Sequence, residues 1–437
     1  SSAAVTLASP ITLGGTQTWT NNSASTLLVN TPAVPNAGFQ LTVDGSGPTT
    51  FGVINNAAVT LSGSGNLVKS GSGLFSLVGT NAGFSGNVTL NGGTMRVNAI
   101  GSIGSGNLTL NGGVYEEYWS NSFTRTLGSG AGQVQILGGT SGFSENGSTG
   151  MNVKLNNNAA FEVVWGSTFF SPSTFVLQAA TAQNGSSLTF ENKIDLNGAN
   201  RTIFTSITTG NQSGSATLSG VIRNSTGTAG LVKEGSGLLY LTAVNTYNGG
   251  TTVNQGTLTA TVPGALPGYA TPGNVTVAAN AMINLRTGAW TAGNIDSLRT
   301  AATWSASTSR LGIDTTAGNF TYASNITEAL TLNKLGNNAL TLSGNNSYTG
   351  GTILSLGSLI VGSATAVPGS GTLSLNGGTI QSSDATARTF SNALSLGGNL
   401  TVGGTGNMTF SNTGALALGA TRTITVTNSG TSATFAQ

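Results

Sequence analysis

Residues 231–258 read LVKEGSGLLYLTAVNTYNGGTTVNQGTL, and this segment gives the clearest indication of the fold. It combines glycine, small polar residues and branched aliphatic residues, with apolar residues two positions apart, as at Leu239 and Leu241. Alternation of this kind predicts a short strand with one buried face. Glycine and asparagine supply the left-handed backbone conformations that tight turns need. The stretch therefore predicts a strand, a turn and a second strand.

The same pattern occurs at two other places in the chain. The best-matching repeats span residues 67–97, 231–260 and 332–361. Each begins with Leu-x-Lys and continues with glycine, an alternating strand, an asparagine, an aromatic residue and a glycine step. The repeat-defining residues are Lys69, Gly71, Gly73 and Asn81, then Lys233, Gly235, Gly237, Asn245, Tyr247, Gly249 and Gly250, and then Lys334, Gly336, Asn346, Tyr348, Gly350 and Gly351. We expect the lysines to lie solvated on the exterior.

A single coil of this size cannot bury its own apolar face, whereas stacked coils bury it together. The sequence therefore predicts an all-β fold, in which residues 1–437 form a single continuous parallel β-solenoid, or β-helix. With about 20–25 residues per coil, the chain would make roughly 20 coils. The repeat pattern breaks at 114–203 and 282–329, where we expect irregular coils with longer, protruding loops. No helical period of useful length is visible.

Composition excludes several kinds of chemistry. Charged residues make up 6% of the 437 residues, against roughly 25% in ordinary soluble domains. The formal net charge of +2 gives no reason to expect nucleic acid as a partner. The chain has no Cys and no His, which excludes thiolate chemistry, Ser-His-Asp triads and most zinc sites. No cofactor is expected, and no apolar run approaches the ~18 residues that membrane insertion would need.

A pair of carboxylates lies in the stretch VYEEYW. Glu116 and Glu117 could serve glycoside hydrolysis, with Tyr115, Tyr118 and Trp119 as sugar platforms. Adjacent residues on a strand point to opposite faces, so these two would not naturally flank one bond. The pattern favours a solvent-facing loop with some aromatic packing.

Two further patterns carry weak functional signals. Asp195 and Asp314 could bind Ca²⁺ between coils, but carboxylates are too sparse for a dense oxygen cage. A threonine row at 421–427 could order water, as ice-binding solenoids do, but threonine is simply a good strand residue. We expect a structural role in both cases, and no metal site.

The two ends of the sequence resemble internal segments. PITLGGTQTWTNN from Pro10 is similar to ALSLGGNLTVGG from Ala393, and RTITVTNSGTSATFAQ from Arg422 is similar to RTIFTSITTGNQSGSATLSG from Arg201. We therefore expect the chain to begin and end part-way through long repeats, with no cap, as a processed product or the ordered part of something larger.

Uncapped coils expose strand edges and apolar faces, which favour pairing with another chain. A head-to-tail contact between different ends does not close, so it grows a filament. The residues expected at this interface are Val5, Leu7 and Ile11 at one end, and Ile424, Val426 and Phe435 at the other.

The repeat follows the pattern L-x-K-x-G-x-G-x-L-x-L-x-x-x-N-x-Y-x-G-G-T-x-x-x-x-G-x-L, best seen at 231–258. It resembles the passenger-associated transport repeat, also called the autotransporter-associated β-strand repeat. The first copy departs from the pattern with Phe84 in place of Tyr and a one-residue insertion, and the third with Asn338 in place of Gly. The resemblance implies an extracellular or cell-surface β-solenoid of a diderm bacterium.

These observations favour a non-enzymatic structural protein that assembles with itself, head to tail, into a surface fibre or matrix filament. The alternative is an autotransporter-like adhesin that binds glycans or cell surfaces. Trp165, Phe169 and Phe170 would form its binding patch, although packing beneath an irregular loop also explains them. An enzyme is the weakest hypothesis, because no nucleophile–base constellation is present.

Overall fold

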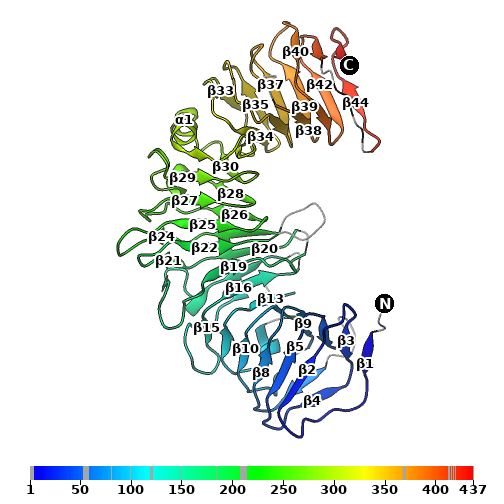
Figure 1. The fold of residues 1–437 in the computed structure, drawn as a ribbon, viewed down its shortest axis with the longest axis vertical. Coiled ribbons are helices and arrows are strands. Elements are labelled where there is room, and N and C mark those ends of the chain that lie inside the picture. The colour runs from blue at the N-terminus through cyan, green and yellow to red at the C-terminus, as the bar shows by residue number, and fades with distance from the viewer. Residues whose placement is uncertain are drawn as a thin grey trace. The chain divides into compact units, whose positions relative to one another are not determined.

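The computed structural model describes residues 4–52, 59–79, 81–98, 100–118, 122–147, 149–183, 185–206, 214–367, 371–411, 414, 416, 418 and 420–436. The chain divides into two compact units, Ser1–Asn248 and Gly249–Gln437. Within each unit, short strands stack in successive coils, and neighbouring strands pair in parallel (Figure 1). The all-β parallel solenoid predicted from the sequence is confirmed.

The long sheets of the first unit are built from one strand per coil. One has the order β1 (Val5–Leu7), β3 (Leu27–Val29), β6 (Thr49–Phe51), β9 (Leu74–Leu77), β11 (Thr94–Val97), β13 (Val114–Glu117), β16 (Thr140–Glu145), β19 (Thr174–Leu177), β22 (Arg201–Phe204) and β25 (Leu231–Glu234). Another has the order β15 (Val134–Ile136), β12 (Leu108–Leu110), β10 (Val88–Leu90), β8 (Leu67–Lys69), β5 (Leu41–Asp44) and β2 (Gln17–Thr20).

Shorter sheets complete the first unit. They are β14 (Ser122–Phe123), β17 (Met151–Val153), β20 (Ser187–Phe190), β23 (Ser215–Leu218) and β26 (Leu238–Leu241); β18 (Glu162–Val164), β21 (Lys193–Asp195) and β24 (Ile222–Arg223); and β4 (Ala33–Pro35) with β7 (Thr60–Ser62). Single 3₁₀ turns lie at η1 (Ile100–Ile103) and η2 (Leu155–Asn157).

The second unit repeats this plan. One row of strands is β27 (Thr251–Val253), β29 (Val275–Val277) and β31 (Thr303–Trp304), and a second is β28 (Thr257–Ala260), β30 (Met282–Arg286), β32 (Arg310–Asp314), β34 (Thr331–Leu335), β36 (Thr352–Leu354), β38 (Leu373–Leu375) and β41 (Leu394–Leu396). A third sheet has the order β33 (Phe320–Tyr322), β35 (Ala339–Leu342), β37 (Ser358–Val361), β39 (Thr379–Ser382), β42 (Leu400–Gly403) and β44 (Ile424–Val426). A fourth has the order β40 (Arg388–Phe390), β43 (Met408–Phe410) and β45 (Ala433–Phe435). It also contains η3 (Pro263–Ala265) and α1 (Ala292–Ala301).

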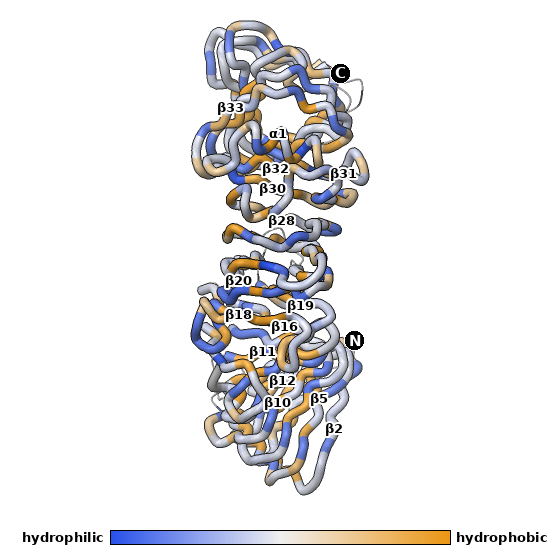
Figure 2. The backbone as a smooth tube through the Cα atoms, turned by 90° about the vertical axis from the view of Figure 1, so that its left-hand side faces the viewer, coloured by the Kyte–Doolittle hydropathy of each residue, from blue (hydrophilic) through white to orange (hydrophobic). Residues whose placement is uncertain are grey.

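The core consists of ladders of aliphatic side chains that run from coil to coil. Val88 and Leu90 of β10 are buried and lie opposite Leu108 and Leu110 of β12, whereas Thr89 between them is only partly buried. Each fully buried aliphatic side chain stabilises the fold by ~1.5–3 kcal/mol. Figure 2 shows hydrophobic residues recurring at the strands of each unit, between turns that are mostly polar.

The coils are longer on average than expected, because the irregular segments carry loops. The number of residues between paired positions gives the length of a coil. It is small where the repeat is regular, as between Val88 and Leu108, and larger within 114–203, as between Thr140 and Thr174. The structure therefore has about 17 turns rather than the roughly 20 expected. That one continuous solenoid runs through both units stays a prediction.

A short helix interrupts the second irregular segment, contrary to expectation. Helix α1 begins after Thr291, whose side chain accepts a hydrogen bond from the backbone N–H of Asn294, while the Asn294 side chain caps Thr291 in return. Ile295 and Leu298 are buried on one side of the helix. Such a capping box starts a helix even where no long apolar period exists.

Candidate functional site

The three repeat lysines lie inside the solenoid, so the expectation that they are solvated is wrong. The exposed fraction is 2% for Lys69 and 0% for Lys233 and Lys334. Lys69 lies in a ladder between Val43 and Leu90, both buried. Each lysine thus occupies an inward position that adjacent coils fill with an aliphatic side chain, and its methylene stem packs there.

The ammonium groups are held by backbone carbonyls at the corner that follows each lysine. Lys334 Nζ donates hydrogen bonds to the carbonyl oxygens of Leu335 and Gly336 at 2.7 Å each, and to Leu356 in the next coil at 3.0 Å. Lys233 Nζ donates in the same way to Glu234 and Gly235. The lysine therefore closes its own corner.

Lys69 follows the same scheme and connects two coils. Its Nζ donates to the carbonyl oxygens of Ser70 and of Gly71, the latter at 2.9 Å, and to Gly92 at 3.4 Å. A carbonyl oxygen interacts best with a charged donor, yet burial penalises that charge. Burial lowers the pKa of Lys69 and of Lys334 to about 8 and that of Lys233 to about 7.

The glycine after each lysine is required by the backbone of the turn. Gly71 has φ +67° and Gly336 has φ +77°, in the left-handed region that a residue with a Cβ rarely adopts. A Cβ on Gly71 would also overlap the backbone of Gly45 in the preceding coil. Lysine and glycine therefore form one structural unit, the repeat corner, defined by the Lys-x-Gly residues 69–71, 233–235 and 334–336.

The repeat asparagine joins three successive coils. Asn346 Oδ1 accepts the N–H of Ile326 at 2.8 Å in the preceding coil, and its Nδ2 donates to the carbonyl of Ala366 at 2.7 Å in the next. Asn81 bonds Leu61 and Ser102 in the same manner. Both asparagine side chains are buried, so the hydrogen bonds that they satisfy are costly to lose.

The aromatic residue and the glycine step complete the motif. Phe84, Tyr247 and Tyr348 are buried, and the Tyr348 hydroxyl shares a 2.5 Å hydrogen bond with Thr352 Oγ1. A family model of the passenger-associated transport repeat matches residues 67–97, 231–260 and 332–361. The chain carries passenger-associated transport repeats. No curated protein and no solved structure matches it significantly.

The passenger-associated transport repeats account for the lysine, glycine and asparagine pattern as architecture. Repeat and fold together fit an autotransporter passenger-like protein. The family suggests an extracellular or cell-surface protein of Gram-negative bacteria. In the described residues, no helix is long and apolar enough to span a membrane.

The carboxylates of VYEEYW lie on a buried strand and not on a solvent-facing loop. Glu116 forms an ion pair with Arg96 at 2.6 Å, and Glu117 accepts a 2.8 Å hydrogen bond from the Tyr115 hydroxyl. Both glutamates are fully buried in β13. Trp119 lies outside the described residues. The side chains thus bond within the coil stack rather than flank an open cleft.

Sequence reasoning missed Glu145, which lies opposite Glu117 in the ladder between β13 and β16. Glu145 is fully buried, and burial raises the pKa of its carboxyl to about 7. A neutral carboxyl next to Glu117 avoids the repulsion of two stacked charges. Only the long spacing of this irregular coil brings the two together, and no local pattern in the sequence shows it.

The two aspartates have structural partners. Asp195 forms an ion pair with Arg223 at 3.1 Å and accepts the N–H of Asn197, and Asp314 forms an ion pair with Arg286 at 3.4 Å. Among the residues described, no group of three or more acidic, His or Cys side chains could hold a metal ion.

The aromatic patch proposed for glycans is largely internal. Trp165 and Phe170 are buried, their rings meet edge to face at 5.4 Å, and Trp165 Nε1 donates to the Pro172 carbonyl. Phe169 alone of the three is partly exposed. The three residues pack an irregular coil and do not form an open aromatic surface.

The first and last coils that the structure describes carry exposed apolar side chains. Val5 is 56% exposed, Ile424 40% and Val426 42%, whereas Leu7, Ile11 and Phe435 are partly exposed. Strands β1 and β44 each close the order of their sheet, so each has one outer edge without a partner strand in the described structure. The predicted interface residues thus lie in the first and last coils that the structure describes, and their role stays a prediction.

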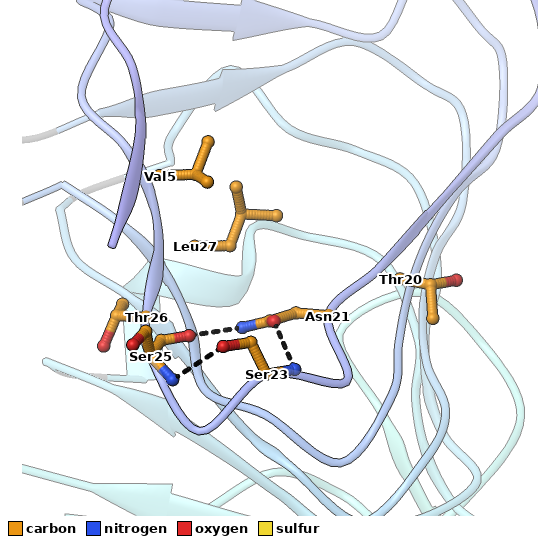
Figure 3. A pocket seen from close by; sticks show the side chains of 7 residues that line it. All are labelled: Val5, Thr20, Asn21, Ser23, Ser25, Thr26 and Leu27. Carbon is orange, nitrogen blue, oxygen red and sulfur yellow. Dashed lines mark hydrogen bonds between the residues drawn. The ribbon is translucent and has the colours of Figure 1, made fainter. Parts of the chain in front are cut away.

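A small pocket of about 150 Å³ lies beside Val5 in the first coil (Figure 3). Val5 and Leu27 line one side, and the turn of Asn21 and Ser25 lines another, with Asn21 Nδ2 donating to the Ser25 carbonyl at 3.0 Å.

Proposed function

We propose that this chain is a non-enzymatic extracellular structural protein, a passenger-like solenoid that assembles head to tail with further copies into a surface fibre. The observation that carries the proposal is the exposure of inward-type apolar residues on the end coils. Ile424 and Val426 lie opposite Leu400 and Val402, which are buried one coil further in, and Val5 lies opposite Leu27, which is partly buried.

Charge distribution supports contact between the two ends. Residues 1–43 contain no charged side chain, and beyond Arg388 the only one is Arg422. Natural sheet edges are commonly protected by lysines or other charges that prevent pairing. The end coils lack this protection, so stacking costs little charge desolvation.

The structural role, as opposed to catalysis, rests on where the candidate catalytic groups lie. The carboxylates of β13 are bonded to Arg96 and Tyr115 inside the stack. The repeat lysines close corners of their own coils. These contacts explain the side chains as parts of the architecture.

The proposal is tested by deleting residues 421–437, which removes β44 and β45. We expect the truncated chain to remain single in sedimentation velocity at concentrations where the full chain assembles. Circular dichroism should still show folded β-structure, because the earlier coils keep their own neighbours. Assembly of the truncated chain equal to that of the full chain would refute the role of this end.

A matched pair of substitutions separates a lost contact from a lost fold. Val426→Lys adds a charge at the open end strand, and Ile353→Lys adds the same charge at an outward, partly exposed position of β36. We expect only Val426→Lys to prevent assembly. Equal assembly by both variants would show that the end strand is not the contact.

A further inference from the structure

Three corners of the solenoid share the tetrapeptide Leu-Asn-Gly-Gly. It occupies residues 90–93, 110–113 and 375–378, and its leucine is the last residue of β10, β12 and β38. The asparagines, Asn91, Asn111 and Asn376, are all exposed. In each corner the asparagine N–H donates to a carbonyl of the preceding coil. The three corners therefore match in sequence, in exposure and in this ladder contact.

An asparagine followed by glycine can lose its side-chain amide without an enzyme. The backbone nitrogen of the glycine attacks the asparagine Cγ and closes a succinimide ring, while the bond from Cγ to Nδ2 breaks and ammonia leaves with the proton of the glycine N–H. Water then opens the ring to give aspartate or isoaspartate. The glycine nitrogen is accessible because no Cβ shields it. A glycine N–H that already donates a hydrogen bond must first lose that bond.

The three corners differ in what the first glycine N–H contacts. Gly112 N–H donates to Ser141 Oγ at 2.7 Å, and this buried hydroxyl in turn donates to the Gly138 carbonyl at 2.8 Å. For the N–H groups of Gly92 and Gly377, the structure shows no hydrogen-bond acceptor among the described residues. Only the second of the three corners therefore holds the nitrogen that would attack.

We propose that Asn91 and Asn376 are sites of spontaneous deamidation, and that Ser141 protects Asn111 from the same reaction. This inference does not depend on the proposed assembly. Each conversion replaces a neutral amide with a carboxylate, so conversion of both sites would bring the formal net charge of the sequence from +2 to zero. In a chain with so few charged residues, two such changes alter the surface charge substantially.

Deamidation at Asn91 also affects a repeat corner. The carbonyl of Gly92 accepts a hydrogen bond from Lys69 Nζ at 3.4 Å. An isoaspartate at this position adds one carbon to the backbone immediately before Gly92. The added carbon shifts the carbonyl that helps to hold the lysine, so the modification would loosen the contact between these two coils.

Other Asn–Gly pairs in the described residues serve as internal comparisons. Asn197 is exposed, but the N–H of Gly198 donates to Asn224 Oδ1 at 2.8 Å. The side chain of Asn248 is held by the Gly227 carbonyl, to which its Nδ2 donates at 2.8 Å. We expect both pairs to react slowly, because either the attacking nitrogen or the side-chain amide is already bonded.

Peptide mapping by mass spectrometry tests the proposal on the full, unmodified chain. Incubated folded at mildly alkaline pH, the chain should deamidate several-fold faster at Asn91 and Asn376 than at Asn111 and Asn197. The same chain kept unfolded in urea should react at similar rates at the three Leu-Asn-Gly-Gly sites, since their local sequence is the same. Equal rates at the three sites in the folded chain, or a difference that persists in urea, would overturn the proposal.

Ser141→Ala tests the protecting contact, because it removes the acceptor of the Gly112 N–H. We expect deamidation at Asn111 to rise several-fold, towards the rate at Asn91, while Asn197 stays slow. The matched control is Ser374→Ala, which removes a partly exposed hydroxyl from β38 and should leave all rates unchanged. An unchanged rate at Asn111 in the folded Ser141→Ala chain would overturn the role of Ser141. If Asn197 also became fast, the variant would have unfolded, and the comparison of the folded and unfolded unmodified chain decides.

Discussion

The buried lysine is the residue that most distinguishes this solenoid from a stack of aliphatic ladders. An amine in the core loses hydration, and three carbonyl contacts at the corner replace part of it. The sequence contained a signal for this placement. Leu67 and Lys69 are two apart on one strand, as are Leu231 and Lys233, so each lysine shares a face with a buried leucine.

The lowered lysine pKa values predict that the fold becomes more stable as pH rises above neutrality. Between pH ~7 and pH ~10, the unfolded chain binds more protons than the folded chain, so the free energy of unfolding increases with pH. For Lys233, whose pKa is about 7, the gain from pH ~7 to pH ~9.5 is on the order of 3 kcal/mol. Urea denaturation of the full chain at both pH values measures it.

Lys233→Met tests the assignment, because it keeps the apolar stem and removes the titrating amine. We expect this variant to lose much of the gain, and the exposed Lys193→Met to keep it. An unchanged gain in Lys233→Met would contradict the account.

Glu145 has the opposite effect on the free energy of unfolding, at lower pH. Because its pKa is raised to about 7 in the folded chain, the free energy of unfolding falls as pH rises from about 4.5 to 7.

At the scale of the coil, the sequence predicted the regular elements well. Strand, corner, strand and asparagine recur with fixed spacing at 67–97, 231–260 and 332–361, because stacking requires each coil to match its neighbour. The irregular coils were not predictable in the same way. The loops of the irregular coils do not follow this spacing. The local sequence pattern therefore predicted neither helix α1 nor the pairing of Glu117 with Glu145.

The asparagine that joins three coils predicts a large local effect of its loss. Asn346→Ala leaves the buried N–H of Ile326 and the buried carbonyl of Ala366 without their partner. We expect a cost of ~2–4 kcal/mol in the free energy of unfolding.

Asn345→Ala is the matched control for Asn346→Ala. Its side chain bonds Thr365 Oγ1 at an exposed position, so we expect a change within about 0.5 kcal/mol. Chemical denaturation followed by tryptophan fluorescence compares the two. Equal effects would show that Asn346 does not hold the coils together.

We place the proposed function at the two end coils. Interior coils bury their inward residues against neighbours on both sides, whereas Val5 of β1 and Ile424 and Val426 of β44 are exposed. From the sequence, these interface residues were predicted on the expectation that the end coils are uncapped.

Negative-stain electron microscopy of the purified full chain over a concentration series tests head-to-tail assembly directly. Head-to-tail stacking predicts unbranched filaments that lengthen as the protein concentration rises. Their width should stay constant, because growth occurs only at the ends. Single particles at every concentration, with no end-to-end contacts, would contradict the account.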